Sequence, residues 1–210
     1  MITPGEISRG IFGAWLLARF NANGMTLFDN TVEAFWRSFW AAAIVLPAYA
    51  ILLMLRYSGD TIGVGTGTAL FVHSVAYVVD WMAFPFLMFY VAPMFNRDQW
   101  YCRYIVAYNW SSVLQVTLML IIGLTAASGF VPPATGYWAT AIALIFVLAY
   151  KGFIAHVALQ ATRTGAAGIV FMDICLSLML EGWSAKLLKL QQVVLALPEK
   201  HPWAIRLGNG

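Results

Sequence analysis

The sequence predicts an all-α, polytopic helical membrane protein, with about five transmembrane helices and an N-terminal interfacial helix. The first observation is composition: of 210 residues, 61% are hydrophobic and 10% are charged, whereas soluble domains average about 45–50% and about 25%. A soluble domain needs a charged surface over its core, and twelve basic plus nine acidic side chains are too few to form one. The second observation is a series of long apolar runs.

The first 33 residues are expected to form a cytoplasmic or interfacial segment. Placed on a helix, several apolar residues of this segment share one face: Ile7, Ile11, Ala14, Trp15 and Ala18. A helix with such a face can lie in the plane of the membrane, with its tryptophan at headgroup depth.

Five apolar runs follow, each long enough to cross about 30 Å of hydrocarbon at about 1.5 Å per residue. They cover residues 38–57, 69–92, 104–127, 138–159 and 168–188. None shows the strict alternation of an outer-membrane barrel strand, so helices are expected. The sequence thus predicts a five-helix transmembrane domain at 34–190 and a C-terminal tail at 191–210.

The last run is open to two interpretations. Asp173 and Glu181 make it less apolar than the others, so it either crosses fully or stops short. In the second case LLKLQQVVLALPEK, residues 187–200, would lie along the membrane surface.

Basic residues near the span ends indicate orientation. With the N-terminus inside, seven of them lie on or toward the cytoplasmic side: Arg9, Arg19, Arg37, Arg97, Arg103, Lys151 and Arg163. Arg56 faces out, and the tail opposes the trend because its lysines would be external. Early loops usually dominate, which predicts a cytoplasmic N-terminus and an external C-terminus.

Ionisable and amide side chains form two layers inside the predicted bilayer. From the helical rise, Asp80, Gln115 and Glu181 lie roughly 17–20 Å from the cytoplasmic face, and Asn109, Lys151 and Asp173 roughly 8–12 Å. Lys151 and Asp173 flank one short hairpin at nearly equal depth, so an ion pair is expected. That pair either locks two spans together or serves transport.

A second set of polar residues lies along the second span. His73, Tyr77 and Asp80 share one helix face, with Tyr77 placed to relay a proton between the other two. Desolvation favours neutral acids at Asp80 and Glu181, which could bond to Gln115 or to each other. The stripe is either an ordinary polar seam between helices or a proton pathway.

The sequence contains no motif for catalysis, for a metal or for a cofactor. Cys102 and Cys175 lack ligand spacing, and no nucleophile elbow or zinc-protease signature is present. A formal charge of +3 without a basic block argues against nucleic acid as a partner. The predicted partners are the lipid bilayer and either further copies of the chain or other membrane-protein subunits.

The layout resembles that of small bacterial Yip1-like membrane proteins. The resemblance rests on an aromatic stretch before the first span (EAFWRSFW, 33–40), on five spans, and on a basic loop leading into a tyrosine-containing third span (NRDQWYCRYIVAYNW, 96–110). The chain lacks the Asp-Leu-Tyr-Gly-Pro-type stretch and the long soluble N-terminal region of the eukaryotic relatives. The resemblance implies a non-enzymatic membrane protein that works through partners or lipids, in a bacterial inner membrane.

Two functional hypotheses follow. The first is a Yip1-like scaffold or subunit of a larger membrane complex, whose polar residues are satisfied within the bundle. The second is a small proton-coupled transporter or permease component that uses Asp80, Glu181 and His73.

Overall fold

The structure, a computed structural model, describes residues 2–57 and 66–196. The elements run in the order α1 (Pro4–Ala18), η1 (Ala22–Leu27), α2 (Val32–Ser38), α3 (Trp40–Tyr57), α4 (Thr66–Met94), η2 (Asp98–Trp100), α5 (Tyr101–Ala127), α6 (Pro133–Ala158) and α7 (Arg163–Ala196). Within the described residues every element is a helix, as the sequence predicts.

Five segments are long and apolar enough to cross a membrane. They are Val32–Leu55, Phe71–Met94, Asp98–Ala127, Pro133–Ala158 and Arg163–Leu187. Their outer faces carry large apolar side chains, for example Met54, Ile145 and Phe171, which are 71%, 68% and 66% exposed. Surfaces of this kind are stable against lipid and unstable against water. The all-α polytopic prediction is confirmed.

Two boundaries differ from the expected ones. The first span is preceded by the separate short helix α2, with a break at Phe39 before α3 begins. At the other end, α7 continues as one helix to Ala196, so residues 187–196 extend the last span and do not form a separate surface helix. The rest of the tail, 197–210, lies outside the described residues.

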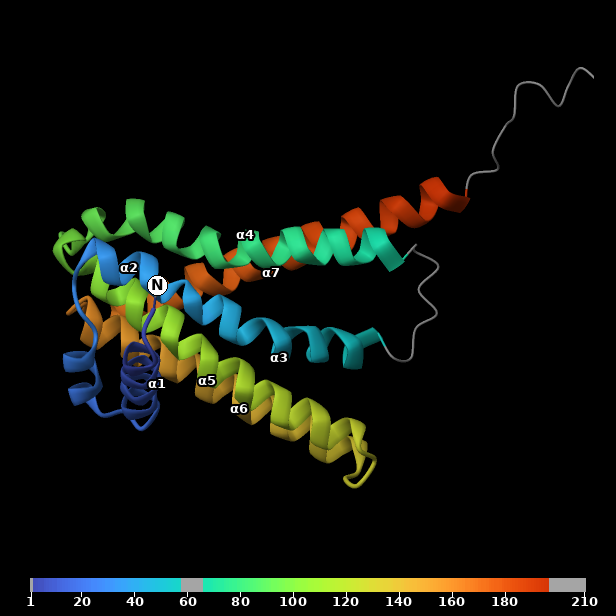
Figure 1. The fold of residues 1–210 in the computed structure, drawn as a ribbon, viewed down its shortest axis with the longest axis horizontal. Coiled ribbons are helices and arrows are strands. Elements are labelled where there is room, and N and C mark those ends of the chain that lie inside the picture. Colours follow the sequence, from blue (N-terminus) through green and yellow to red (C-terminus); the bar gives the residue numbers. More distant parts are fainter. Residues whose placement is uncertain (1, 58–65, 197–210) are drawn as a thin grey trace, which may run out of the picture.

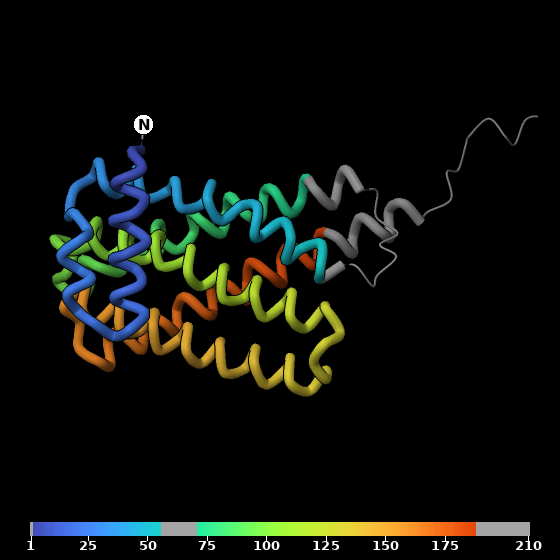
Figure 2. The backbone as a smooth tube through the Cα atoms, turned by 60° about the horizontal axis from the view of Figure 1, so that its bottom comes forward, coloured from blue at the N-terminus to red at the C-terminus, as the bar shows by residue number. Residues whose placement is uncertain are grey.

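The helices converge at one end of the molecule and diverge toward the other (Figure 1). We call the first the α1 end: it contains α1, η1, η2 and the connection at 159–162. The far end contains the connection at 128–132 and the C-terminal part of α7. Figure 2 shows α1 running across the α1 end, crosswise to the spans. This is the placement expected of an interfacial helix.

The buried core is concentrated at the α1 end, around α5. The buried residues of α5 run from Tyr104 to Val113, and its remaining turns toward the far end have none. Two long-range hydrogen bonds hold this end together. The Tyr150 hydroxyl donates to the Ala14 carbonyl at 2.7 Å, and the Asn30 side chain accepts from the backbone N–H of Arg103 at 3.0 Å. The second bond satisfies a first-turn donor of α5 that has no partner within the helix.

Helix α1 buries one face against the rest of the protein. Gly10, Gly13, Ala14 and Leu17 are buried, whereas Trp15 is 51% exposed. Two glycines set this rotation, because they let α1 approach its neighbours closely. A Cβ on Gly10 would lie 2.4 Å from the indole of Trp110 on α5. The tryptophan therefore faces away from the protein, where an interfacial side chain is expected.

The contact between α1 and η1 is the tightest backbone approach at this end. A Cβ added to Gly24 would lie 2.6 Å from the backbone oxygen of Gly13. Backbone atoms cannot rotate away as a flexible side chain can, so Gly24→Ala should force α1 and η1 apart.

We predict that Gly24→Ala lowers the free energy of unfolding by about 1–3 kcal/mol, the usual cost of overpacking. The measurement is thermal denaturation of the purified protein in a mild detergent. Gly168→Ala is the matched control: a Cβ there meets nothing within 4 Å, and alanine favours a helix. Equal melting temperatures for Gly24→Ala and the wild type would contradict the close approach.

Ion pairs connect α1 to the chain around α2. Glu6 forms a capping box with Thr3, whose backbone N–H donates to the Glu6 carboxylate at 2.8 Å. The other carboxylate oxygen pairs with Arg37, and Arg37 also pairs with Glu33 at 2.5 Å. The backbone hydrogen bond from Thr3, with the bond from Arg37 second, holds the pKa of Glu6 below its ordinary value of 4.5.

We predict that this contribution to stability is lost in acid. Because the pKa of Glu6 is lower in the folded state, its contribution is fully present above pH 4.5 and disappears as the pH falls through the folded value. Glu6→Gln should therefore melt below the wild type at neutral pH and together with it in strong acid. A difference between the two that is unchanged by acid would contradict this role for the Glu6 charge.

Candidate functional site

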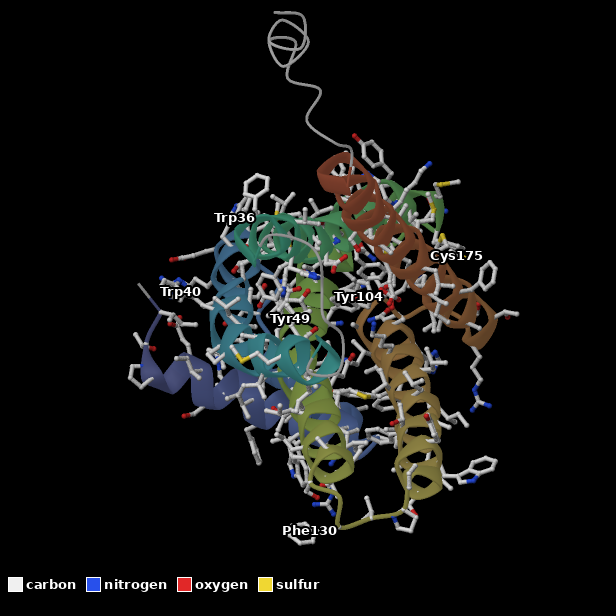
Figure 3. All side chains as sticks on the ribbon, turned by 90° about the vertical axis from the view of Figure 1, so that its right-hand side faces the viewer. Trp36, Trp40, Tyr49, Tyr104, Phe130 and Cys175 are labelled. Atoms are coloured by element: carbon white, nitrogen blue, oxygen red, sulfur yellow. The ribbon has the colours of Figure 1, made fainter. Side chains whose placement is uncertain are left out.

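A cavity of about 400 Å³ lies among α3, α4, α5 and α7. We call it the acidic cavity because three carboxylates line it, Asp80, Asp173 and Glu181. Tyr49 and Tyr108 also line it, from α3 and α5. Figure 3, which views the molecule from its far end, shows Tyr49 and Tyr104 within the bundle, while Trp36 and Phe130 lie on its outside.

The cavity ends at a hydrogen-bonded cluster that joins three helices. The Lys151 ammonium on α6 donates to Asp173 Oδ2 on α7 at 2.6 Å, and the Tyr108 hydroxyl on α5 donates to Asp173 Oδ1 at 2.7 Å. The ion pair expected from the equal depth of Lys151 and Asp173 is therefore present. Both carboxylate oxygens are satisfied, as burial in a low-dielectric medium requires.

Asp80 and Glu181 lie on facing helices, α4 and α7, and line the same cavity. The Asp80 carboxylate makes no hydrogen bond or ion pair with another described residue, and Glu181 is its neighbouring charge. The two acids share one cavity, but no hydrogen bond joins their carboxyl groups, although the sequence allowed one. An ionised carboxylate at this depth without a partner costs free energy. Binding a proton or a cation at Asp80 is therefore favourable, because it neutralises the charge.

Tyr77 has the structural one of the two roles that the sequence left open, a polar contact between helices. Its hydroxyl donates to the carbonyl of Ala42 on α3 at 2.6 Å, and its ring packs on Tyr49 with centroids 4.8 Å apart. The proton of that hydroxyl is thus directed to α3 and away from a relay. His73, Tyr77 and Asp80 do line the acidic cavity together, so the shared helix face was predicted correctly.

Gln115 has a partner other than the one suggested by the sequence, and Asn109, for which only a depth was predicted, is bonded to α2. Gln115 donates to the Ser111 hydroxyl four residues earlier, at 2.9 Å, and it does not line the acidic cavity. The expected bond from Asp80 or Glu181 to Gln115 is wrong. Asn109 is fully buried and donates to the Ser38 hydroxyl at 2.8 Å. It therefore joins α5 to α2 and takes no part in the Lys151–Asp173 layer.

Aromatic side chains form much of the cavity wall, and sequence reasoning did not select them as site residues. They include Tyr49, Trp81, Phe84 and Tyr108. Tyr108 stacks on Phe84 with centroids 4.4 Å apart, and its ring lies 5.2 Å from the Lys151 ammonium. Tyr104 and Tyr108 are four residues apart and so lie on one face of α5. The spacing of the two tyrosines was visible in the sequence, but the direction in which their helix face points was not.

The cavity is suited to holding positive charge without a metal. Within residues 2–57 and 66–196, no group of three or more His, Cys, Asp or Glu side chains could hold a metal ion. Aromatic faces attract cations through their quadrupole, and carboxylates attract them through charge. A cavity with both kinds of wall can bind an organic cation, and its acids can bind a proton instead.

Comparisons with protein-family models, curated proteins and solved structures give no match to this chain.

We predict that removing either partner of the central ion pair is more harmful than removing both. Lys151→Met leaves the Asp173 carboxylate buried without its partner, and Asp173→Leu does the same to the Lys151 ammonium. Each single variant should lose about 3–5 kcal/mol of unfolding free energy. The double variant should recover much of that loss, because two apolar side chains replace two charges. The four proteins form a double-mutant cycle, measured by unfolding in mixed detergent micelles. Additive losses would contradict a direct interaction.

Proposed function

We propose that this integral membrane protein is a small transporter or permease component that binds a cation in the acidic cavity and exchanges it with protons. The observation that carries the proposal is the placement of Asp80 and Glu181 on facing helices of one cavity. Charged groups inside a membrane most often mark the path of a solute, an ion or a proton.

The charges around the cavity support a cationic ligand. Three carboxylates line it, and Lys151 compensates one of them through its pair with Asp173. A cation that enters the cavity gains the attraction of Asp80, whose carboxylate has no partner among the described residues, and a proton can replace the cation when it leaves. The acids thus provide competition between cation and proton, which is the basis of exchange.

The aromatic wall favours an organic cation over a bare metal ion. Tyr49, Trp81, Phe84 and Tyr108 offer ring faces, which suit a weakly hydrated ammonium group. A small hard cation would need several oxygen ligands arranged around it.

We further propose that the N-terminus lies in the cytoplasm, with the α1 end inside. Six arginines lie at that end, namely Arg9, Arg19, Arg37, Arg97, Arg103 and Arg163. The connection at 128–132 at the far end carries no charge. This asymmetry is the one that the positive-inside rule describes. The resemblance to small bacterial proteins supports placement in a bacterial inner membrane.

A Yip1-like scaffold or subunit of a larger membrane complex is the second candidate. It is favoured by the polar groups that are bonded inside the bundle, above all Tyr77 to Ala42 and Tyr108 to Asp173. Such a protein would act through other subunits or through further copies of itself. Both candidates are non-enzymatic, and they differ in whether the Asp80 charge is needed for activity.

We predict that Asp80→Asn abolishes proton-driven cation uptake without loss of the fold. The probe is radiolabelled tetraethylammonium, added outside proteoliposomes that are acidic inside. The wild type should accumulate it, and Asp80→Asn should fall to the level of protein-free vesicles. Its melting temperature should change by less than about 4 °C, the effect of about 1 kcal/mol in a chain of this size.

Asp98→Asn is the matched control, because Asp98 is an exposed acid in η2 and does not line the cavity. It should transport as the wild type does. If the wild type accumulates no probe, or if Asp80→Asn transports normally and only melts earlier, the transport proposal is wrong and the scaffold is favoured.

A further inference from the structure

A second concave surface lies on the outside of the bundle, between α6 and α7. This groove has a volume of about 640 Å³, and we call it the α6–α7 groove. Its lining residues are Phe20, Leu148, Gly152, Phe153, His156, Arg163, Ala166, Ala167, Val170, Phe171 and Ile174. Most are apolar, the two polar ones are basic, and none is acidic. The acidic cavity, by contrast, lies on another side of α7 and has three carboxylates.

The length of the groove fits one leaflet of a bilayer. On α7 it extends from Arg163, the first residue of the helix, to Ile174. At about 1.5 Å per residue this is roughly 16 Å, and half of the hydrocarbon thickness is about 15 Å. The groove therefore begins at the α1 end, at headgroup depth, and stops near the middle of the membrane.

The basic residues lie at the headgroup end of the groove. Arg9 and Arg37, at the same end of the molecule, are already paired with acids. Arg163 makes no ion pair with any acid in the described part of the chain, and it is exposed. The Nδ1 of His156 donates to the Ala161 carbonyl at 2.6 Å, so its Nε2 can donate to an anion when the ring carries a second proton. These groups can receive an anion at headgroup depth.

The floor and one wall of the groove have shapes that suit a straight hydrocarbon chain. Gly152 and Ala167 have small side chains and contribute little height to the floor. Phe20 supplies a wall from outside the helix pair, with its ring 5.4 Å from that of Phe153. Its φ of +55° is that of a left-handed residue ending α1, where the next N–H, that of Asn21, donates to the Leu16 carbonyl at 3.0 Å.

We propose that the α6–α7 groove binds one anionic phospholipid, with its phosphate on Arg163 and His156 and one acyl chain along the floor. Basic pockets between transmembrane helices on the cytoplasmic side recognise anionic headgroups in this way. The site does not depend on the acidic cavity, so it holds whether the protein is a transporter or a scaffold.

The test is native mass spectrometry of the full chain in a nonionic detergent, with phosphatidylglycerol and phosphatidylcholine of identical chains as probes. The wild type should retain phosphatidylglycerol in preference to phosphatidylcholine. Arg163→Gln should weaken that retention about five-fold, the usual effect of one basic residue near an anionic surface. Arg97→Gln is the matched control, because Arg97 lies at the same end, does not line the groove and should change nothing.

Ala167→Trp tests the apolar part of the site. Ala167 is exposed in the groove, so the indole would occupy the position of the acyl chain without entering the core, and both lipids should be lost. Equal retention of the two lipids by the wild type, or no effect of Arg163→Gln, would overturn the proposal. A dimer that Ala167→Trp dissociates would also overturn it, since a second copy of the chain would then occupy the groove.

Discussion

The constraint on which the rest of the structure depends is the low dielectric of the bilayer around Lys151 and Asp173. A single charge at this depth costs about 2.5–3.5 kcal/mol on insertion scales, so α6 and α7 must keep a relative position in which ammonium and carboxylate meet at 2.6 Å. Tyr108 adds α5 through its bond to the same carboxylate. Three spans are thereby fixed at one level, and that level forms the end of the acidic cavity.

The arrangement of the cavity follows from how unevenly the bundle is packed. At the α1 end, glycines let α1 and η1 come together, and α5 is buried from Tyr104 to Val113. Beyond that level the helices diverge toward the far end (Figure 1), so polar side chains on α4 and α7 face a space and not one another's backbone. The tight end supplies the stability that allows Asp80, which has no partner among the described residues, to persist farther along α4.

The sequence was sufficient to predict features that depend on how deep a residue lies in the membrane. It was insufficient to predict features that depend on how each helix is rotated about its own axis. Five spans follow from hydropathy, and the Lys151–Asp173 pair follows because a short hairpin puts both residues at one level. Gln115 was placed at the level of Asp80, but depth does not reveal that the Ser111 hydroxyl lies one turn away in the same helix. Tyr77 likewise bonds to a carbonyl of α3, whose position relative to α4 is set by packing across the bundle.

Helix α7 carries opposite chemistry on two of its sides. Asp173, Ser177 and Glu181 recur every four residues and line the acidic cavity, whereas Arg163, Ala167, Val170 and Ile174 line the outer groove. On α6, Lys151 pairs with Asp173 and the next residue, Gly152, belongs to the groove. Any movement of α7 against α6 must therefore stretch the ion pair, change the width of the groove and shift the acids of the cavity together. One interaction thus sets the spacing of both concave surfaces.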